Sequence, residues 1–291
     1  MIKKKIIIGT AQLNNIYGVI KNQKKMDLKE FEKILSLMKK NKLHMFDTAE
    51  NYNNQKILAK KLNEKDKIIT KFKFNKNKVY DENKVKEFID EILNNLNKDS
   101  IYGLLLHNPE VIKSKNFKIF FNLLTKLKKN KIMKIGFSCY KISEIKYILK
   151  HYNFQILQFP FNIFDQRIIE DLSVLNLLKK KKIELHIRSI FLQGLLLDKK
   201  TQQLPFFSNW SKLFNRYNKY INRLGINSLS ACLHFIVQHN FYDKIVVGVN
   251  NSKHLKELLK LLVYSKLKKN YNFVNFKSKS INLIIPYLWK N

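Results

Sequence analysis

Cysteine, proline and glycine are all scarce in this chain of 291 residues, which has two, four and seven of them respectively. A chain of this length can bury a large core without a disulfide. Cys139 and Cys232 do not have the spacing of a metal-binding pair. No linker rich in proline or glycine divides the sequence. We therefore expect a single domain over residues 1–291, in a reducing compartment, with no bound metal.

Long hydrophobic runs are also missing. No stretch of about 18 apolar residues occurs, the length that a membrane-spanning helix needs. The first ten residues, "MIKKKIIIGT", have three consecutive apolar residues before Gly9, too few for the core of a secretion signal. We expect a cytoplasmic protein that does not bind a membrane.

Arginine is rare although the chain is strongly basic. The net charge is +34, and only four of the 56 basic residues are arginine, the residue best suited to bidentate contacts with phosphates and bases. The lysines are spread along amphipathic segments, as at 128–131 and 179–182. Solvated helix faces explain them better than a nucleic-acid interface does. Nucleic-acid binding stays an alternative that duplex binding at about 200 mM salt would support.

Eight short apolar runs recur along the chain, at residues 5–10, 44–48, 67–71, 102–107, 133–138, 154–159, 183–189 and 244–249. Their nearly continuous apolar composition is typical of parallel strands covered on both faces. Between them, apolar residues repeat at helical spacing, in segments 27–41, 54–62, 82–97, 116–130, 142–151, 170–182, 228–240 and 252–264. Asp27 and Glu30 are placed as a capping pair for the first helix.

The alternation of strand and helix predicts a (β/α)8 TIM barrel. An open dinucleotide-binding sheet is disfavoured, because no Gly-x-Gly-x-x-Gly follows the first run. We expect residues 196–226, after the seventh run, to be a long loop. This loop and the tail 264–291, with Trp289, should shape the pocket.

Polar residues stand at the same end of successive apolar runs. They are Thr10, Asp47, Lys71, His107, Ser138, Gln158, Arg188, Ser189 and Gly248. Active sites of TIM barrels lie at the carboxyl ends of the strands, so these side chains should surround one opening. Taken singly, Asp47 could cap a helix and Lys71 could be a surface lysine. On neighbouring strands, however, a buried aspartate and lysine would neutralise each other.

Tyr52 follows Asp47 closely, and these two residues together with Lys71 and His107 indicate a reaction. A phenol ionises near pH ~10, and a neighbouring ammonium lowers that pKa. Lys71 would supply the ammonium, Asp47 would keep it charged, and Tyr52 would act as a general acid, worth roughly 10²–10⁴ in rate. His107 would orient the reacting oxygen. None of these groups can deliver hydride to a carbonyl carbon, so a nicotinamide cofactor is implied.

Eight motifs in order resemble those of the aldo/keto reductase family. They are "GTAQ" (9–12), "FDTAENY" (46–52), "ITK" (69–71), "LLLHNP" (104–109), "KIGFSCY" (134–140), "LQFPFN" (157–162), "RSIFLQGLL" (188–196) and "VVGVNNSKHLKEL" (246–258). The resemblance spans residues 6–258 and implies NAD(P)H-dependent reduction of a small aldehyde or ketone. By the same matching, the catalytic residues are Asp47, Tyr52, Lys71 and His107. The branch with the "RSxFLQGLL" motif suggests a sugar-type substrate.

The resemblance also implies a cofactor site for NADP or NAD, with a lean towards NADP. Ser138 and Gln158 would hold the nicotinamide carboxamide. Arg188 stands where many members stack an aromatic ring. The remaining expected contacts are Ser189 and Gly194 along the pyrophosphate, Asn250, Asn251, His254 and Glu257 near the adenosine, and Thr10 and Gly248 at the strand ends. His254 occupies the position of the arginine that often binds the 2′-phosphate.

The sequence departs from the family after Tyr52, where Asn53 replaces a glycine and Gln55 a glutamate. This departure leaves open a second hypothesis, a nicotinamide-binding sensor or assembly subunit with little turnover. A third hypothesis makes Lys71 a Schiff-base nucleophile. Candidates for contact with substrate are Gln12, Tyr17, Phe137 and Phe161, each of which could equally be a packing residue.

Overall fold

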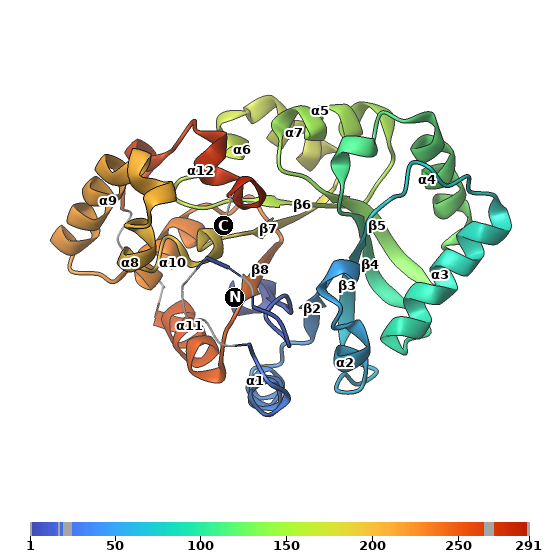
Figure 1. The fold of residues 1–291 in the computed structure, drawn as a ribbon, viewed down its shortest axis with the longest axis horizontal. Coiled ribbons are helices and arrows are strands. Elements are labelled where there is room, and N and C mark those ends of the chain that lie inside the picture. The colour runs from blue at the N-terminus through green and yellow to red at the C-terminus, as the bar shows by residue number, and fades with distance from the viewer. Residues whose placement is uncertain (1, 17, 20–24, 265–270, 290–291) are drawn as a thin grey trace.

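The computed structural model describes residues 2–16, 18–19, 25–264 and 271–289, and its strands close into a barrel (Figure 1). Each strand pairs in parallel with the next along the chain, and the last pairs with the first. The strands are β1 (Ile6–Gly9), β2 (Met45–Asp47), β3 (Lys67–Phe72), β4 (Ile101–Leu106), β5 (Ile132–Ser138), β6 (Ile156–Pro160), β7 (Glu184–Arg188) and β8 (Lys244–Gly248). The expected (β/α)8 TIM barrel is confirmed.

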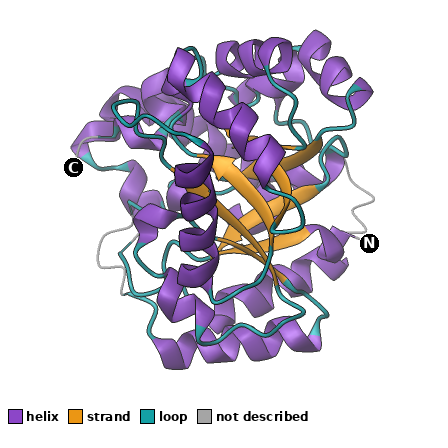
Figure 2. Cartoon of the chain, turned by 90° about the vertical axis from the view of Figure 1, so that its right-hand side faces the viewer, coloured by secondary structure: helices purple, strands orange, loops and turns teal. Residues whose placement is uncertain are grey.

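Helices follow the strands and cover the outside of the barrel, as Figure 2 shows. They are α1 (Leu28–Lys40), α2 (Gln55–Ala59), α3 (Glu82–Leu96), α4 (Lys115–Leu127), α5 (Ile142–His151), α6 (Arg167–Glu170), α7 (Leu172–Lys180), α10 (Ser228–Gln238) and α11 (Ser252–Tyr264). All eight helical segments expected from spacing are present, with ends shifted by a few residues. One of them, 170–182, is preceded by the short α6.

The helix ends follow two rules of local chemistry. At N-termini, Asp27 and Asp81 each accept a hydrogen bond from the amide three residues on, at 2.8 Å. After the C-termini of α1, α4 and α7, the residues Lys42, Lys129 and Lys182 adopt φ of 54°, 38° and 53°. Glycine usually occupies this left-handed position, and this glycine-poor chain fills it with lysine.

The expectation that residues 196–226 form a loop was wrong. The segment contains α8 (Lys199–Gln202), a 3-10 helix (Pro205–Trp210) and the 13-residue α9 (Ser211–Arg223). Phe214, Tyr217 and Ile221 are buried at helical spacing. The signal is easily missed because lysine, asparagine and arginine fill the rest of this helix.

The tail forms the short α12 (Ile281–Ile284) and ends near Trp289. The indole of Trp289 donates to the carbonyl of Asn282 at 2.9 Å, and its ring meets Phe207 edge-on at 5.0 Å. Trp289 therefore packs against the tail and the segment before α9.

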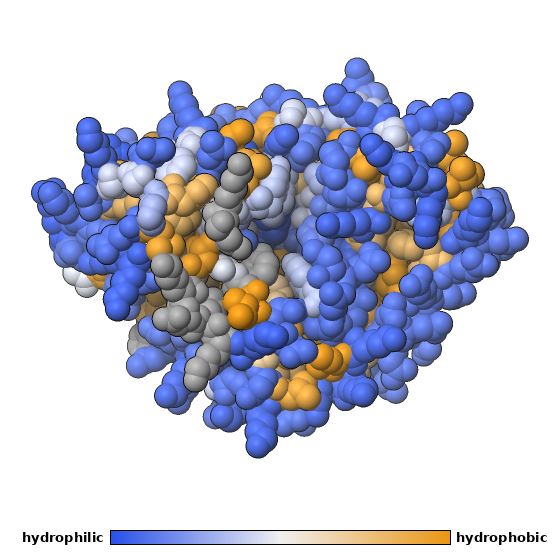
Figure 3. Space-filling view, viewed as in Figure 1, coloured by the Kyte–Doolittle hydropathy of each residue, from blue (hydrophilic) through white to orange (hydrophobic). Residues whose placement is uncertain are grey.

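Strand register brings the sequence-predicted polar residues together. Gly9 pairs with both Asp47 and Gly248, and Ser138 pairs with Gln158. The interior below this ring is apolar, built from Ile7, Met45, Ile69, Leu105, Ile156 and Val246. On the outside, hydrophilic residues cover most of the face seen in Figure 3. Among the described residues, no helix is both long enough and apolar enough to cross a membrane.

Candidate active site

A cavity of about 620 Å³ opens at the carboxyl ends of the strands. Thirteen of the fifteen residues expected to be catalytic or to bind the cofactor line it: Asp47, Tyr52, Lys71, His107, Ser138, Gln158, Arg188, Ser189, Gly194, Gly248, Asn250, His254 and Glu257. These residues come from the ends of seven strands, β2 to β8, or the segments that follow them, and Gly9, Ala11 and Gln12 line the cavity at the end of β1. The structure thus gathers in one place side chains up to 210 positions apart in sequence (257 − 47).

Thr10 and Asn251, also expected at the cofactor, support their neighbours and do not line the cavity. The hydroxyl of Thr10 donates to the carbonyl of Asp47 at 3.1 Å. The side-chain oxygen of Asn251 accepts from the amide of His254 at 2.9 Å. Any direct contact of these two residues with a cofactor stays a prediction.

A buried ion pair between Lys71 and Asp47 lies at the bottom of the cavity. The Lys71 ammonium bonds one carboxylate oxygen of Asp47 and also donates to the carbonyl of Thr48 at 3.0 Å. The other oxygen of Asp47 accepts from Nε2 of Gln158 at 2.8 Å. Burial lowers the pKa of Lys71, and the charge of Asp47 opposes that shift. Neither group could be removed without leaving the other charged and buried.

Tyr52 and His107 lie beside this pair. The Lys71 nitrogen is 5.7 Å from the centroid of the Tyr52 ring. The rings of Tyr52 and His107 are 6.4 Å apart, with an interplanar angle of 87°. The four side chains that the sequence singled out therefore surround one space.

His107 is fixed by its own strand end. Its amide donates to the carbonyl of Phe72 at 2.8 Å, and the neighbouring Asn108 bonds both the amide and the carbonyl of Phe74. Burial, together with the charges of Lys71, Arg188 and Lys73, lowers the pKa of His107 to about 3. The imidazole is consequently neutral at pH 7 and can donate one hydrogen bond while accepting another.

The two departures after Tyr52 are accommodated by the backbone. Asn53 adopts φ 52° and ψ 29°, a left-handed conformation that asparagine tolerates better than other side chains except glycine. Gln55 is buried and donates to Thr70 Oγ1 at 2.7 Å. Asn54, also buried, donates to the carbonyl of Thr10 at 2.7 Å. The loop that carries Tyr52 is thus anchored to β1 and β3.

The part of the cavity lined by Gln158 fits a carboxamide group. The side-chain oxygen of Gln158 is buried and has no hydrogen-bond partner among the described residues. Such an acceptor suits an amide N–H₂ donor. At Gly248, a Cβ would lie 2.5 Å from Nε2 of Gln12, so a larger residue there would displace the Gln12 amide.

Arg188 presents a flat cation to the cavity. Its guanidinium carbon lies 3.9 Å from the centroid of the Tyr140 ring, and its nitrogens donate to the carbonyl of Cys139 and the hydroxyl of Ser189, both at 3.3 Å. Tyr140 lines the cavity and was not predicted, although it stands two residues after Ser138. Tyr140 in turn packs edge-on against Tyr287 of the tail at 4.8 Å.

The loop after β7 has an unusual backbone. Ser189, Leu192 and Gln193 have φ of 56°, 48° and 52°, and Gly194 has φ 94°. Left-handed residues other than glycine cost energy and concentrate at functional sites.

Sequence reasoning also missed the N-terminus of α10, where Asn227, Ser228 and Leu229 line the cavity. The available signal was the helix cap at Asn227, which accepts from Ser230 N at 2.8 Å.

The four proposed substrate contacts differ in their placement. Gln12 lines the cavity. Phe137 stacks on Phe121 at 5.3 Å and Phe161 lies 4.9 Å from Phe235, so both are core residues. Tyr17 lies outside the described residues. None of the described tail residues lines the cavity, whereas Leu197 and Asp198 of the segment 196–226 do. Residues 265–270 and 290–291 of the tail lie outside the described residues. Among residues that the structure describes, no cluster of histidine, cysteine or acidic side chains could hold a metal ion.

A (β/α)8 barrel with a buried lysine–carboxylate pair, a tyrosine and a neutral histidine at its carboxyl end defines a class of oxidoreductase. The sequence profile of the Aldo/keto reductase family matches residues 5–273. The chain belongs to this family.

Solved structures of the family share the fold. The aldo-keto reductase AKR11C1 from Bacillus halodurans, in its holo form, is 17% identical with a TM-score of 0.69, over 95% of this chain and 93% of that chain. The glycerol dehydrogenase AKR11B4 from Gluconobacter oxydans is 14% identical with a TM-score of 0.64, over 97% of this chain and 92% of that chain. No curated protein sequence matches this chain significantly.

Proposed function

We propose that this protein is an NAD(P)H-dependent reductase that converts a small aldehyde or ketone, of sugar type, to the alcohol. The observation that carries the proposal is the buried Lys71–Asp47 pair beside Tyr52 and His107 in a single cavity. Membership of the aldo/keto reductase family supports the reaction class.

In this proposal Tyr52 donates its hydroxyl proton to the carbonyl oxygen of the substrate. The ammonium of Lys71 favours the phenolate that results. Asp47 and the carbonyl of Thr48 hold that ammonium in place. The phenolate then regains a proton from solvent through the open cavity.

His107 donates a hydrogen bond to the same carbonyl oxygen and sets its orientation, which a neutral imidazole can do. Gln158 and Ser138 would hold the carboxamide of the cofactor. When bound, the reduced nicotinamide supplies the hydride. The side chains that line the cavity would hold the nicotinamide close to the carbonyl carbon of the substrate and would exclude water from that carbon.

The Schiff-base hypothesis is disfavoured by the contacts of Lys71. Formation of a Schiff base needs a neutral amine, whereas this amine is bonded by a carboxylate and a carbonyl oxygen. Borohydride treatment with a carbonyl substrate would label Lys71 covalently only if that hypothesis were correct.

A single-turnover experiment tests the reductase proposal. Binding of NADH and NADPH is titrated by fluorescence, and oxidation of the bound nucleotide is then followed in stopped flow with a panel of aldehydes and sugars. The proposal expects nucleotide binding and oxidation by at least one carbonyl compound. Binding without oxidation by any of them would favour the sensor or assembly-subunit hypothesis.

A further inference from the structure

A groove at the amino end of the barrel lies on the opposite side from the candidate active site. It measures about 1500 Å³ and is bounded by the C-terminal ends of α1 and α3 and by the starts of β2 to β5. We propose that this groove binds an acidic segment of a partner protein. The inference does not rest on the proposed function, because the groove shares no lining residue with the cavity.

Charge is distributed unevenly between the two ends of the barrel. The segments that precede the eight strands contain thirteen lysines and four acidic residues. They are residues 2–5, 41–44, 60–66, 97–100, 128–131, 152–155, 181–183 and 239–243. In the segments that lead from each strand to the next α-helix, the described residues include six lysines and six acidic residues. A general enrichment of the chain in lysine would act on both ends alike, so it does not explain this asymmetry.

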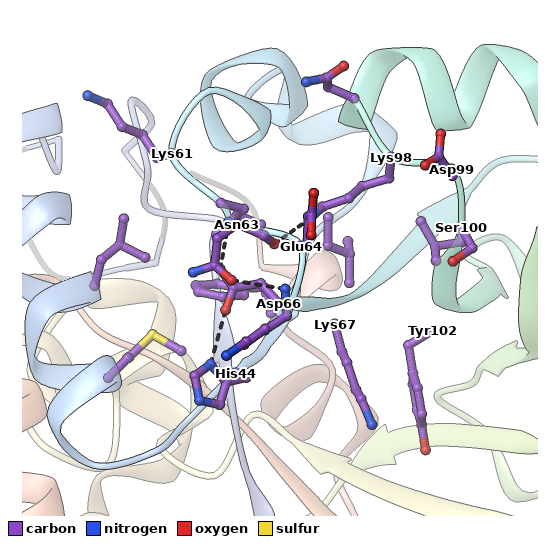
Figure 4. Close-up of a pocket in the computed structure, with 18 of the residues that line it drawn as sticks. His44, Lys61, Asn63, Glu64, Asp66, Lys67, Lys98, Asp99, Ser100 and Tyr102 are labelled. Carbon is purple, nitrogen blue, oxygen red and sulfur yellow. Dashed lines mark hydrogen bonds and ion pairs between the residues drawn. The ribbon is translucent and has the colours of Figure 1, made fainter.

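Three exposed lysines in the groove lack an anionic partner. Lys39, Lys65 and Lys67 line the groove, and none of them forms an ion pair with a described residue. The ammonium of Lys67 instead lies 5.4 Å from the centroid of the Tyr102 ring, and Figure 4 shows the two side chains side by side. Helix dipoles account for a cation such as Lys39 at the end of α1, but Lys65 and Lys67 lie well beyond the last residue of α2. Their charge is therefore available to a partner.

The rest of the lining favours a polypeptide over a nucleic acid. Glu64 and Asp99 are exposed in the same groove and would repel the continuous negative charge of a phosphate backbone. An acidic polypeptide can place a neutral or basic side chain against them. The exposed carboxamides of Asn94 and Asn97 can both donate to and accept from peptide groups. Met133, which is 55% exposed, offers an apolar contact.

The test is a binding titration on the full chain with three probes at about 150 mM salt, where long-range attraction between exposed charges is screened. The first probe is a short fluorescein-labelled peptide of glutamate, serine and leucine. A single-stranded oligouridylate and vesicles of phosphatidylglycerol represent the other polyanions that a basic surface could attract.

Two variants separate the groove from the net charge of the chain. The groove variant combines three substitutions: Lys39→Gln, Lys65→Gln and Lys67→Gln. The control variant removes the same charge from an exposed lysine run at the end of α7 that does not line the groove: Lys179→Gln, Lys180→Gln and Lys181→Gln. Because all six side chains are exposed, both variants should unfold at the urea midpoint of the wild type.

The wild type should bind the acidic peptide more tightly than the RNA or the vesicles. The groove variant should weaken that binding by about tenfold and the control variant by less than about twofold, since each exposed ion pair contributes modestly. Equal weakening in the two variants would mean that net charge alone attracts the peptide, and it overturns the inference. Tighter binding of the RNA or the vesicles, or no binding of the peptide, overturns it as well. Nucleotide binding should be the same in all three proteins, because the cavity lies at the other end of the barrel.

Discussion

The two ends of the barrel contain the same four kinds of ionisable side chain in different bonding patterns. At the carboxyl end these are Tyr52, Lys71, Asp47 and His107, which line the cavity. At the amino end they are Tyr102, Lys134, Glu184 and His186, on β4, β5 and β7. Because the kinds of side chain agree, other features must distinguish the proposed reaction centre from the structural cluster.

At the amino end the carboxylate is the centre of the cluster. Glu184 accepts from the Tyr102 hydroxyl at 2.7 Å, pairs with the ammonium of Lys134, and lies 2.8 Å from Nε2 of His186. The Tyr102 oxygen also accepts from Lys134 at 2.9 Å. The phenol is thus used twice inside the cluster, and burial raises its pKa. Such a phenol joins three strands together and is a poor acid.

At the carboxyl end the carboxylate has different hydrogen-bond partners. Both oxygens of Asp47 are bonded, by Lys71 and by Gln158, while Tyr52 lines the cavity. The comparison teaches that residue type alone does not identify a proton donor. The partner of the carboxylate and the access of the phenol to a cavity decide the role.

Cavity size would have pointed to the wrong end. The groove at the amino end measures about 1500 Å³ against about 620 Å³ at the carboxyl end. Figure 4 shows its lining, in which Asp66 bonds His44 and the backbone of Asn63, and Lys67 and Tyr102 stand alongside. This lining mixes lysine, asparagine and acidic residues, most of them exposed, with buried apolar residues such as Met38, Phe46 and Ile68. The smaller cavity holds the buried ion pair, which is the more informative feature.

Replacing the tyrosine of each cluster by phenylalanine should give the largest difference between the two ends of the barrel. Tyr52→Phe should lower kcat by roughly 10²–10⁴ while nucleotide still binds, because the proton donor is lost. Tyr102→Phe, the matched control, should keep its activity and lose roughly 1.5–3 kcal/mol of unfolding free energy, the value of a hydrogen bond to a charged group. Steady-state kinetics and urea unfolding measure both. Full activity in Tyr52→Phe would remove this residue from the mechanism.

Removing the lysine of each cluster should lower the unfolding free energy by different amounts at the two ends. Lys71→Met leaves the carboxylate of Asp47 buried without its cation, so unfolding free energy should fall by about 3–5 kcal/mol at pH 7. Lys134→Met leaves Glu184 with Tyr102 and His186, and its side chain is 33% exposed. We expect a loss of roughly 0.2–1 kcal/mol there, the value of a partly exposed ion pair. Equal losses in urea unfolding would show that the two pairs are equivalent.

The amino-end cluster should also make stability depend on pH. Burial raises the pKa of Glu184, but hydrogen bonds from His186, Lys134 and Tyr102 outweigh it and lower the value to about 2. The unfolded value is ~4.3. The stabilisation, about 3 kcal/mol, is therefore present above pH ~4.3 and lost as pH falls towards about 2. Unfolding of Glu184→Gln across this range should show a weaker dependence on pH than the wild type; an unchanged slope would contradict the assignment.

The smallest expected effect concerns His107. Since its pKa is lowered to about 3, protonation of this side chain should leave no trace in kcat/KM between pH 5 and 8. An NMR titration of the ring should show it neutral over that range. An ionisation near pH ~6.5 that disappears in His107→Gln would contradict the neutral imidazole.

Sequence reasoning could find the strands and the polar ring because both signals are local. Each apolar run is followed by its polar residue, and parallel strands must end at the same edge, so Asp47, Lys71 and His107 could be brought together without coordinates. Strand and helix ends differ from expectation by a few residues because caps and frayed turns set them.

What could not be found depends on packing between distant elements. Tyr140 is identified only by its contact with Arg188. Phe137 precedes Ser138 and therefore points to the other face of the strand, which the pattern could have shown. α9 was missed because its three buried residues are diluted by lysine and asparagine.

The lysines at φ 54°, 38° and 53° after α1, α4 and α7 have a broader consequence. Each occupies a conformation that costs a side chain of this type roughly 1 kcal/mol relative to glycine. The molecule carries several such penalties at its periphery and still encloses a closed sheet with an apolar interior. The connections of this fold therefore accommodate unfavourable backbone conformations, whereas Lys71, Asp47 and Gln158 at the opening are bonded in series.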